Sequence, residues 1–487
     1  MKLKEPQILL LALICCKTLP HQIFADTPCC EDYCYSSDRD KSQVLRYATK
    51  TAYEFAKGAQ TNNDYYVPNC EPKKIWILSR HGTRYPTGKE MKRMADLVNL
   101  RDEILDNYDT RRSKPDTGAL CEGDLAGFRN WEWDSNITAN YDQYLVWQGW
   151  EDLKFLAKSF QKRFPQVMGN YYEREKYLFR HTDTERTASS YKAFVEGLFG
   201  PNAYLNINIP PPPANDTLLK FYDLCPAFDD QSAAAKGPDS EYQKFINSPT
   251  GQRVISEISQ RLGFKFSLSA KQIDTIFDTC RYEQAWHLDK YSAWCSAFTK
   301  SQIEALEYLE DIKYYYKQGY GSELNSNIAC TLVQDMLTHM GSDKNPSVVT
   351  YFAHSSTVQL FLTALGVAKD RDSLRADNYG DMTYRHWRTS KIGPFTANIA
   401  AVKYECPREA EPNKIMFFLN EKPVNFDWCK VGLCEYSVLL SHLRRFQHAD
   451  CSQFFCGGNG ARSLQNFSWF YVIIAFGVIK FINLIRN

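Results

Sequence analysis

The segment IWILSRHGTRYPTGKEMKRM (residues 75–94) changes character within a few positions. An apolar run at 75–78 ends, and His81 then lies between Arg80 and Arg84. Two guanidinium groups so close together repel each other, and they disfavour protonation of the histidine between them. A bound anion would remove this repulsion, because each guanidinium can grip an oxyanion with two hydrogen bonds. The segment therefore predicts a buried strand that runs into an anion-binding loop.

Two further junctions of the same kind lie downstream. A short apolar strand at 177–179 precedes a polar loop, and a helix begins near Arg186 and stops at Gly200. A third strand, at 347–352, ends next to His354, and a helix follows at 358–365. Strands that alternate with helices indicate an α/β sheet, whose sites form where loops leave the carboxyl ends of the strands. We expect the three junctions to meet in one crevice.

The remaining chain divides by pattern into further elements and domains. Helical periodicity covers 42–57, 89–106 and 143–164, strands are expected at 398–404 and 414–419, and 107–140 reads as a long surface excursion. The proline run at 210–213 precedes mainly helical patterns. The predicted domains are a Cys-bearing lead-in (26–70), an α/β domain (71–213 and 326–450) and an inserted α-helical domain (214–325).

The residue types at these junctions suit phosphoryl transfer. Three arginines (Arg80, Arg84 and Arg186) match a tetrahedral dianion. A neutral imidazole among them can attack phosphorus and form a phosphohistidine. Positioning and charge stabilisation provide most of the catalysis in such reactions, and arginines supply both without a metal. Taken alone, Arg84 or Arg186 would more often be a salt-bridge partner, and His354 would more often be a hydrogen-bonded core residue. Arg180 and His181 are expected to be structural or supporting residues.

The string RHGTRYP (80–86), with DTERTASSYKAFVEGL (183–198) and the histidine after the third strand, resembles the histidine acid phosphatases. The strings FYDLCPAF, CRYEQAWH, SAWCSAF, EYLEDIKYYYKQGYG and RTSKIGPFTANIAAVKYEC narrow this resemblance to the multiple inositol polyphosphate phosphatases. The resemblance implies a three-layer α/β domain with a mixed sheet, a smaller helical domain, and a substrate between them. It implies His81 as the nucleophile and Arg80, Arg84, Arg186 and His354 as ligands of the transferred phosphate, with no metal or cofactor.

One position departs from that family. Where the family carries His-Ala-Glu, this chain reads His354-Ser355-Ser356. The missing glutamate protonates the departing alkoxide, and losing such a group costs on the order of 10²–10⁴ in rate. A serine hydroxyl is a far weaker acid. The sequence His448-Ala449-Asp450 does not follow an apolar strand and is not expected to replace it.

Three functions therefore remain open from the sequence. The first is a phosphomonoesterase that acts on inositol polyphosphates, with catalysis weakened by the missing acid. The second is an inositol-phosphate-binding pseudophosphatase, and the third is a structural cell-surface protein. Lys89, Lys92 and Arg93 follow the motif on a helix. They either hold the non-reacting phosphates of a polyphosphate or form a solvated helix face.

Composition and the two ends bear on partners and compartment. A net charge of +1 over 487 residues gives no overall field for nucleic acid. Residues 1–25 read as a signal peptide, with Lys2 and Lys4 before an apolar run. Residues 451–487 read as a lipid-anchor signal or as one membrane span at 467–485, although Lys480 interrupts the apolar tail. A protein of the secretory pathway, tethered at the cell surface, is expected.

The cysteines and sequons agree with that compartment. Of the 16 cysteines, Cys15 and Cys16 lie in the signal segment, and the other fourteen (16 minus 2) are an even number, as disulfides require. The close spacings 429/434 and 451/456 suit short disulfide loops, while the connectivity stays open. Asn136 (NIT) and Asn215 (NDT) are glycosylation sequons.

Overall fold

The computed structural model describes residues 32–58, 66–110, 114–429, 432–451 and 456. Its centre is a seven-stranded sheet in the order β2-β3-β1-β4-β5-β6, with β7 paired to β5. The strands are β1 (Glu71–Arg80), β2 (Tyr177–His181), β3 (Val348–Ala353), β4 (Asn398–Glu405), β5 (Asn413–Leu419), β6 (Lys422–Pro423) and β7 (Leu433–Glu435). β1 and β2 run parallel to β3, whereas β4 runs antiparallel to β1. The sheet is mixed, as expected.

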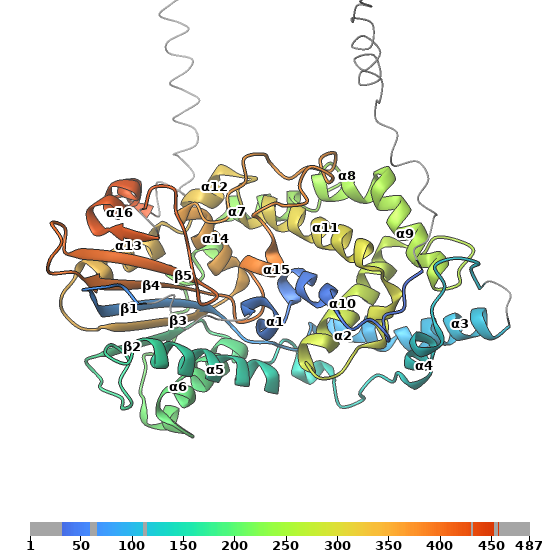
Figure 1. The fold of residues 1–487 in the computed structure, drawn as a ribbon, viewed down its shortest axis with the longest axis horizontal. Helices are drawn as coiled ribbons and strands as arrows, with labels where there is room; N and C mark the ends of the chain where they lie inside the picture. The colour runs from blue at the N-terminus through green and yellow to red at the C-terminus, as the bar shows by residue number, and fades with distance from the viewer. Residues whose placement is uncertain (1–31, 59–65, 111–113, 430–431, 452–455, 457–487) are drawn as a thin grey trace, which may run out of the picture.

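Helices cover both faces of this sheet (Figure 1). α5 (Trp147–Arg163) and α6 (Glu185–Phe199) lie on one face, and α13 (Cys330–Gly341) and α14 (Ser355–Leu365) lie on the other. The fully buried side chains of β1 alternate between the two cores: Ile75 and Ile77 pack with α5 and α6, whereas Trp76 and Leu78 pack with α13 and α14. This two-residue period is the reason for the continuous apolar run, and it confirms the three-layer α/β fold.

The remaining helices gather beyond one end of the sheet (Figure 1). They include α2 (Gly88–Ala95), α3 (Leu97–Asp109), α4 (Glu122–Asn130), α8 (Glu241–Asn247), α9 (Pro249–Arg261), α10 (Ala270–Trp286) and α11 (Lys300–Gln318). α7 (Pro226–Ala234) and α12 (Glu323–Asn327) lie nearer the sheet, as do the C-terminal helices α16 (Tyr436–His442) and α17 (Arg444–Gln447). α2 packs on α10, so helices from before residue 214 belong to this helical region. The predicted domain boundaries stay a prediction.

Three predicted segments differ from the structure. Instead of one helix over 42–57, the chain forms short turns η1 (Ser42–Arg46) and η2 (Ala48–Lys50) and the short α1 (Tyr53–Lys57), because Ala48 adopts a left-handed backbone with φ of 49°. The helix expected over 89–106 is divided at Asp96 into α2 and α3. The stretch 107–140 is not only a surface excursion, because α4 buries Phe128 against Trp294.

The described chain contains six disulfides: 34–121, 70–406, 225–456, 280–295, 330–451 and 429–434. All except 280–295 and 429–434 join distant parts of the sequence. The local pair 429–434 confirms one expected loop. The other expectation was wrong, because Cys451 pairs with Cys330 and Cys456 pairs with Cys225. A disulfide closed across a long loop restricts the unfolded chain more than a short one does.

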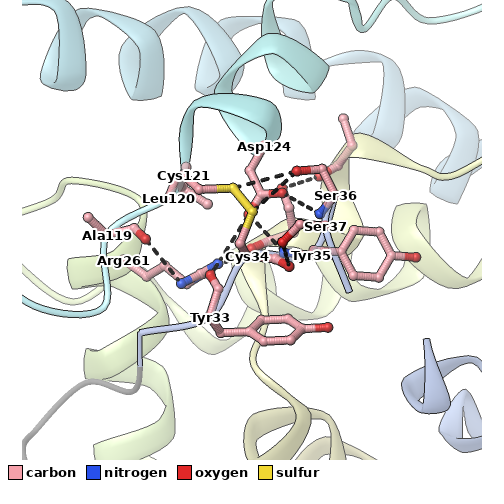
Figure 2. Close-up of a disulfide and its surroundings, with 12 residues drawn as sticks. Tyr33, Cys34, Tyr35, Ser36, Ser37, Ala119, Leu120, Cys121, Asp124 and Arg261 are labelled. Atoms are coloured by element: carbon pink, nitrogen blue, oxygen red, sulfur yellow. Dashed lines mark hydrogen bonds and ion pairs between the residues drawn. A yellow bond between two sulfur atoms is a disulfide. The ribbon is translucent and has the colours of Figure 1, made fainter. Parts of the chain in front are cut away.

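Figure 2 shows how one disulfide is supported. Cys34 and Cys121 join the lead-in to the start of α4, and the adjacent Asp124 accepts hydrogen bonds from the Tyr35 and Ser36 amides at 3.1 and 2.8 Å. The buried Arg261 lies 3.4 Å from the Asp124 carboxylate. The lead-in is therefore fastened to the helical region and is part of the folded body.

The predictions for the chain ends fall outside the described residues. The signal peptide over 1–25 cannot be placed, and of the anchor segment over 451–487 only Cys451 and Cys456 are described. Within the described ranges, no helix is both long and apolar enough to cross a membrane.

Candidate active site

The structure brings the three predicted junctions together at one edge of the sheet. β1 and β3 are parallel, and their register pairs Arg80 with Ala353, so the next residues, His81 and His354, emerge side by side. The His81 amide donates to the Ala353 carbonyl at 3.0 Å. The two imidazole rings lie 5.8 Å apart, centroid to centroid, in an edge-on arrangement. Arg186 enters from the first turn of α6, with its Nη2 3.3 Å from His354 Nδ1.

Two glycines allow the loop after β1 to pack this tightly. A Cβ on Gly82 would lie 2.4 Å from the carbonyl oxygen of Gly149, and a Cβ on Gly149 would lie 2.2 Å from the carbonyl oxygen of Thr83. The loop therefore rests directly on the backbone of α5, and neither position can hold a side chain without a backbone shift. The Gly82 amide also donates to Ser190 Oγ of α6 at 3.1 Å. These contacts fix the backbone on which His81 is mounted.

The surroundings of His81 keep its ring neutral and determine which of its nitrogens is protonated. Its Nδ1 lies 2.8 Å from the Gly82 carbonyl oxygen, which only accepts, so Nδ1 carries the hydrogen and Nε2 carries the lone pair. Burial, followed by the charges of Arg80, Arg186 and Arg84, holds the pKa of His81 well below its usual value. A neutral imidazole with a free Nε2 is the nucleophilic form.

Arg80 is buried and held in place by backbone carbonyls. Its Nη1 donates to Thr49 O at 2.5 Å and to Gly393 O at 2.8 Å, and its guanidinium lies over the Phe395 ring at 4.6 Å. Burial and the nearby Arg84 lower the pKa of Arg80. No carboxylate pairs with it in the described structure, and its Nε has no hydrogen-bond partner there. A cation in this position is matched to an incoming anion.

His354 is the N-cap residue of α14, and both of its nitrogens are engaged. Arg186 only donates, so Nδ1 is the acceptor and Nε2 donates to the buried Thr182 hydroxyl at 2.9 Å. Burial and then Arg186 and Lys220 hold the pKa of His354 well below its usual value. Arg84 completes the group from the loop side, where its Nη1 donates to Tyr85 O at 2.6 Å. Three guanidiniums and two neutral imidazoles thus face one small volume.

The other predicted residues lie outside this group. Arg180 is 3.6 Å from Asp216 Oδ1, and the His181 ring stacks on Tyr191 with centroids 5.7 Å apart, so both support the scaffold. Lys89 and Lys92 are exposed on α2, and Arg93 is partly buried. Their role as outer phosphate contacts stays a prediction. The sequon residues Asn136 and Asn215 are exposed, as glycosylation requires.

Ser356, at the position of the missing acid, contacts the helical region. Ser356 Oγ accepts a hydrogen bond from Gln318 Nε2 of α11 at 2.6 Å. The rival segment 448–450 is exposed on the outer side of α13, where Gln334 donates to Ala449 O at 3.0 Å. This segment is poorly placed to donate a proton to a leaving group.

Sequence reasoning missed residues that reach the site from the lead-in and from α11. Thr49 supplies a carbonyl to Arg80, and its hydroxyl lies 3.5 Å from the Tyr314 hydroxyl. Lys50, the next residue, lies 3.8 Å from both Asp278 and Glu310. For Tyr314 the signal was the string EYLEDIKYYYKQGYG, which does not show the direction that the side chain faces. For Thr49 and Lys50 it was only the helical periodicity over 42–57.

Comparison with known proteins agrees with this geometry. The profile of the Histidine phosphatase superfamily (branch 2) matches residues 73–420. Multiple inositol polyphosphate phosphatase 1 of Drosophila melanogaster is 45% identical over 435 residues, covering 89% of this chain and 92% of that protein. The Homo sapiens protein of the same name is 29% identical over 433 residues, covering 82% and 86% respectively.

Solved structures share the fold. The phytase from D. castellii gives a TM-score of 0.65 at 16% identity, covering 88% of this chain and 92% of that one. The Bifidobacterium longum Multiple Inositol Polyphosphate Phosphatase in complex with inositol hexasulfate gives 0.58 at 14% identity, covering 82% and 97%. The profile match, the 45% identity and the shared fold lead to one conclusion: this chain belongs to the histidine phosphatase superfamily, branch 2.

Proposed function

We propose that this protein is a phosphomonoesterase that hydrolyses inositol polyphosphates through a phosphohistidine on His81. The observation that carries the proposal is the free Nε2 of a buried, neutral His81 that faces Arg80, Arg84 and Arg186. Nε2 forms the bond to phosphorus as the ester P–O bond breaks. Water then attacks phosphorus, the N–P bond breaks, and phosphate leaves.

The arginines stabilise the charge on the transferred phosphoryl group. Each guanidinium can hold two phosphoryl oxygens. Arg80 needs no reorganisation when the substrate binds, because two backbone carbonyls already fix its guanidinium. The Gly82 carbonyl accepts the Nδ1 hydrogen of His81 and so stabilises the positive charge that phosphorylation places on the ring. A bound dianion also raises the pKa of His354, which can then turn a protonated nitrogen toward the phosphate.

Inositol polyphosphate is the substrate class that the relatives suggest. Relatives named multiple inositol polyphosphate phosphatase match most of this chain. The structure of one protein of that name, from Bifidobacterium longum, contains inositol hexasulfate and shares the fold. Additional cations near the site suit a substrate with several phosphates. Lys220 interacts electrostatically with His354, and Lys50, Lys236 and Lys313 interact electrostatically with Tyr314. These charges support a binding site that extends beyond one phosphate.

The missing glutamate supports a second candidate, an inositol-phosphate-binding pseudophosphatase. Ser356 holds no acidic proton, yet every phosphate-binding residue is retained. Turnover of inositol hexakisphosphate by wild-type protein and by the His81→Ala variant separates the two. Turnover that His81→Ala abolishes supports the enzyme. Tight binding measured by calorimetry, with no turnover between pH 4 and 8, supports the pseudophosphatase.

A secretory, cell-surface location completes the proposal. The six disulfides support an oxidising compartment, and the exposed sequon asparagines are compatible with glycosylation. The signal peptide and the C-terminal anchor remain proposals from the sequence. Release of the protein from cells by a phosphatidylinositol-specific phospholipase would support the lipid anchor, and retention in the membrane fraction would contradict it.

A further inference from the structure

Cleavage of a phosphate ester needs a proton for the leaving oxygen. In the family that this chain resembles, a glutamate supplies this proton, and this chain has Ser356 at that position. We propose that Tyr314, on the face of α11 that covers the site, is the proton donor of this protein. The inference rests on the proposed phosphatase function. In this role Tyr314 does more than support the site, because its phenolic Oη gives up the proton that the leaving oxygen receives.

The position of Tyr314 follows from its neighbours on α11. Asp311 accepts hydrogen bonds from the Thr389 amide and hydroxyl at 2.8 and 2.6 Å, and Gln318 donates to Ser356 at 2.6 Å. Both contacts cross from α11 to the α/β part of the protein. Tyr314 lies between them on the same helix face, three residues after Asp311 and four before Gln318. It is therefore about 6 Å along the helix axis from the residue that holds Ser356.

The hydroxyl of Tyr314 contacts Thr49, the residue whose carbonyl holds Arg80. It lies 3.5 Å from Thr49 Oγ1, and the carbonyl of the same Thr49 holds Arg80 Nη1 at 2.5 Å. The charges of Arg80 and Tyr314 influence each other's ionisation, as expected for neighbouring groups. Tyr314 keeps part of its surface exposed. The proposed role requires that the leaving oxygen of a bound substrate come within hydrogen-bonding distance of this phenolic oxygen.

The charges around Tyr314 make its phenol acidic enough for this role. Burial alone raises the pKa of Tyr314, but the ammonium groups of Lys50 and Lys313 outweigh burial and lower the pKa to about 7. Glu310 opposes them, and Lys236 and Arg80 add positive charge from other elements. Lys313 Nζ also lies over the phenol ring, 4.9 Å from its centroid. A donor with a pKa near the working pH is the most effective general acid.

Two carboxylates near the site, Glu310 and Asp152, are engaged in other contacts. Glu310 pairs with Lys313 and Arg281, and these charges hold its pKa well below the usual value, so it has no proton to give. Burial raises the pKa of Asp152 to about 7, but Asp152 is bonded to Thr83 and Gln148 on the α5 side of the loop. Asp183 and Asp223 remain as carboxylate rivals near the site, and Asp223 is ion-paired with Lys220 at 2.7 Å.

The proton balance of the proposed steps is complete. His81 Nε2 bonds to phosphorus, the electron pair of the P–O bond goes to the inositol oxygen, and this oxygen takes the Tyr314 proton. Lys50 and Lys313 stabilise the resulting phenolate. The water that then attacks the phosphohistidine gives its proton to the phenolate, which restores Tyr314. The negative charge of a bound polyphosphate raises the pKa of Tyr314, so the donor is protonated in the complex.

The test compares two substrates across matched variants. An inositol alkoxide needs a proton to leave, whereas nitrophenolate leaves unaided. Tyr314→Phe should therefore lower kcat on inositol hexakisphosphate by about 10²-fold and change kcat on p-nitrophenyl phosphate by less than about threefold. Tyr316→Phe is the control, because it removes a hydroxyl of the same helix that instead donates to Leu374 O at 3.0 Å. It should leave both rates within about twofold.

A pH profile provides a second readout that a structural role would not move. For wild-type protein, kcat/KM on inositol hexakisphosphate should fall as pH rises through about 7, because the free enzyme loses the Tyr314 proton. Dividing the wild-type profile by that of Tyr314→Phe cancels the ionisation of the substrate itself. The ratio should be large at acidic pH and approach one at alkaline pH.

The outcomes distinguish the role of Tyr314 from the proposed function as a whole. Equal losses on both esters, or no loss, overturn the role of Tyr314. A selective loss in Asp183→Asn or Asp223→Asn, in place of Tyr314→Phe, assigns the proton to that carboxylate and also overturns it. If His81→Ala keeps the activity, or wild-type protein cleaves neither ester, the proposed function itself fails. His81-dependent cleavage with no selective effect of Tyr314→Phe rejects only this inference.

Discussion

Restoring a carboxyl group at position 356 tests the role of the missing proton donor. Ser356 is the second residue of α14 and lies two positions after His354. Gln318 Nε2 donates to Ser356 Oγ at 2.6 Å, and a glutamate carboxylate can accept the same hydrogen bond. The helix N-terminus adds about 0.3–1 kcal/mol in favour of a negative charge there. Ser356→Glu should therefore fold with nearly unchanged stability.

The expected gain depends on whether another donor is present. A general acid contributes on the order of 10²–10⁴ in rate, or about 3–5 kcal/mol of barrier. One turnover transfers one proton, so a new donor adds less where Tyr314 already supplies it than where Tyr314 is absent. We expect Ser356→Glu to raise kcat on inositol hexakisphosphate about 10-fold in wild-type protein and about 10²-fold in the Tyr314→Phe background. The gain on p-nitrophenyl phosphate should be smaller in both backgrounds.

The assay is steady-state phosphate release from both esters, with two control variants. Ser356→Gln has the size of glutamate without its acidic proton and should give no gain. Ser355→Glu places the carboxyl about 100° around the helix, at a residue bonded to Gln359 at 2.6 Å, and should also give none. Equal gains on both esters, or a gain with Ser356→Gln, would refute the reasoning, because neither depends on proton donation.

Three further predictions concern the loop after β1, the second histidine and the proposed nucleophile His81. Gly82→Ala places a Cβ 2.4 Å from the Gly149 carbonyl oxygen, so it should cost about 1–3 kcal/mol of stability and abolish cleavage of both esters, as measured by denaturant unfolding and phosphate release. Thr182→Val leaves the buried Nε2–H of His354 without its acceptor, and the resulting loss of about 1–3 kcal/mol should appear as a lower melting temperature and weaker competitive inhibition by inorganic phosphate. Because burial and the arginines hold the pKa of His81 well below 6.5, its nucleophilic form persists as the pH falls, and kcat/KM on p-nitrophenyl phosphate should not show an acid limb near pH 6.5.

Matched controls make these outcomes decisive. Gly88→Ala introduces a Cβ whose nearest neighbour is 3.4 Å away and should be tolerated, whereas equal damage at both glycines would contradict the packing argument. Thr338→Val removes an exposed hydroxyl, and a similar effect there would show that Thr182 has no special role. Arg84→Gln removes one of the charges on His81 and should move the acid limb to higher pH. An unchanged limb would contradict the electrostatic account.

Much of the fold and the centre of the site could be predicted from local sequence. The apolar run of β1, the loop that places His81 between two arginines and the strand-to-helix junction at His354 are all properties of neighbouring residues. Local sterics and burial set such features, so a short window of sequence contains the information. Parallel strands then place consecutive junctions at one edge, which brought His81, Arg186 and His354 together as expected.

The tertiary structure alone decided what surrounds that centre. Thr49 comes from the lead-in and Tyr314 from the helical region, 265 residues apart in the sequence, and they meet at Arg80. The partners of Cys451 and Cys456 were equally hidden, because the nearest cysteine in sequence was not the nearest in space. The patterns after the proline run at 210–213 indicated helices, yet which face of a helix meets the sheet depends on how whole elements pack. The charge environment of Tyr314 depends on the same packing, because electrostatic energies follow distances in space and not positions along the chain.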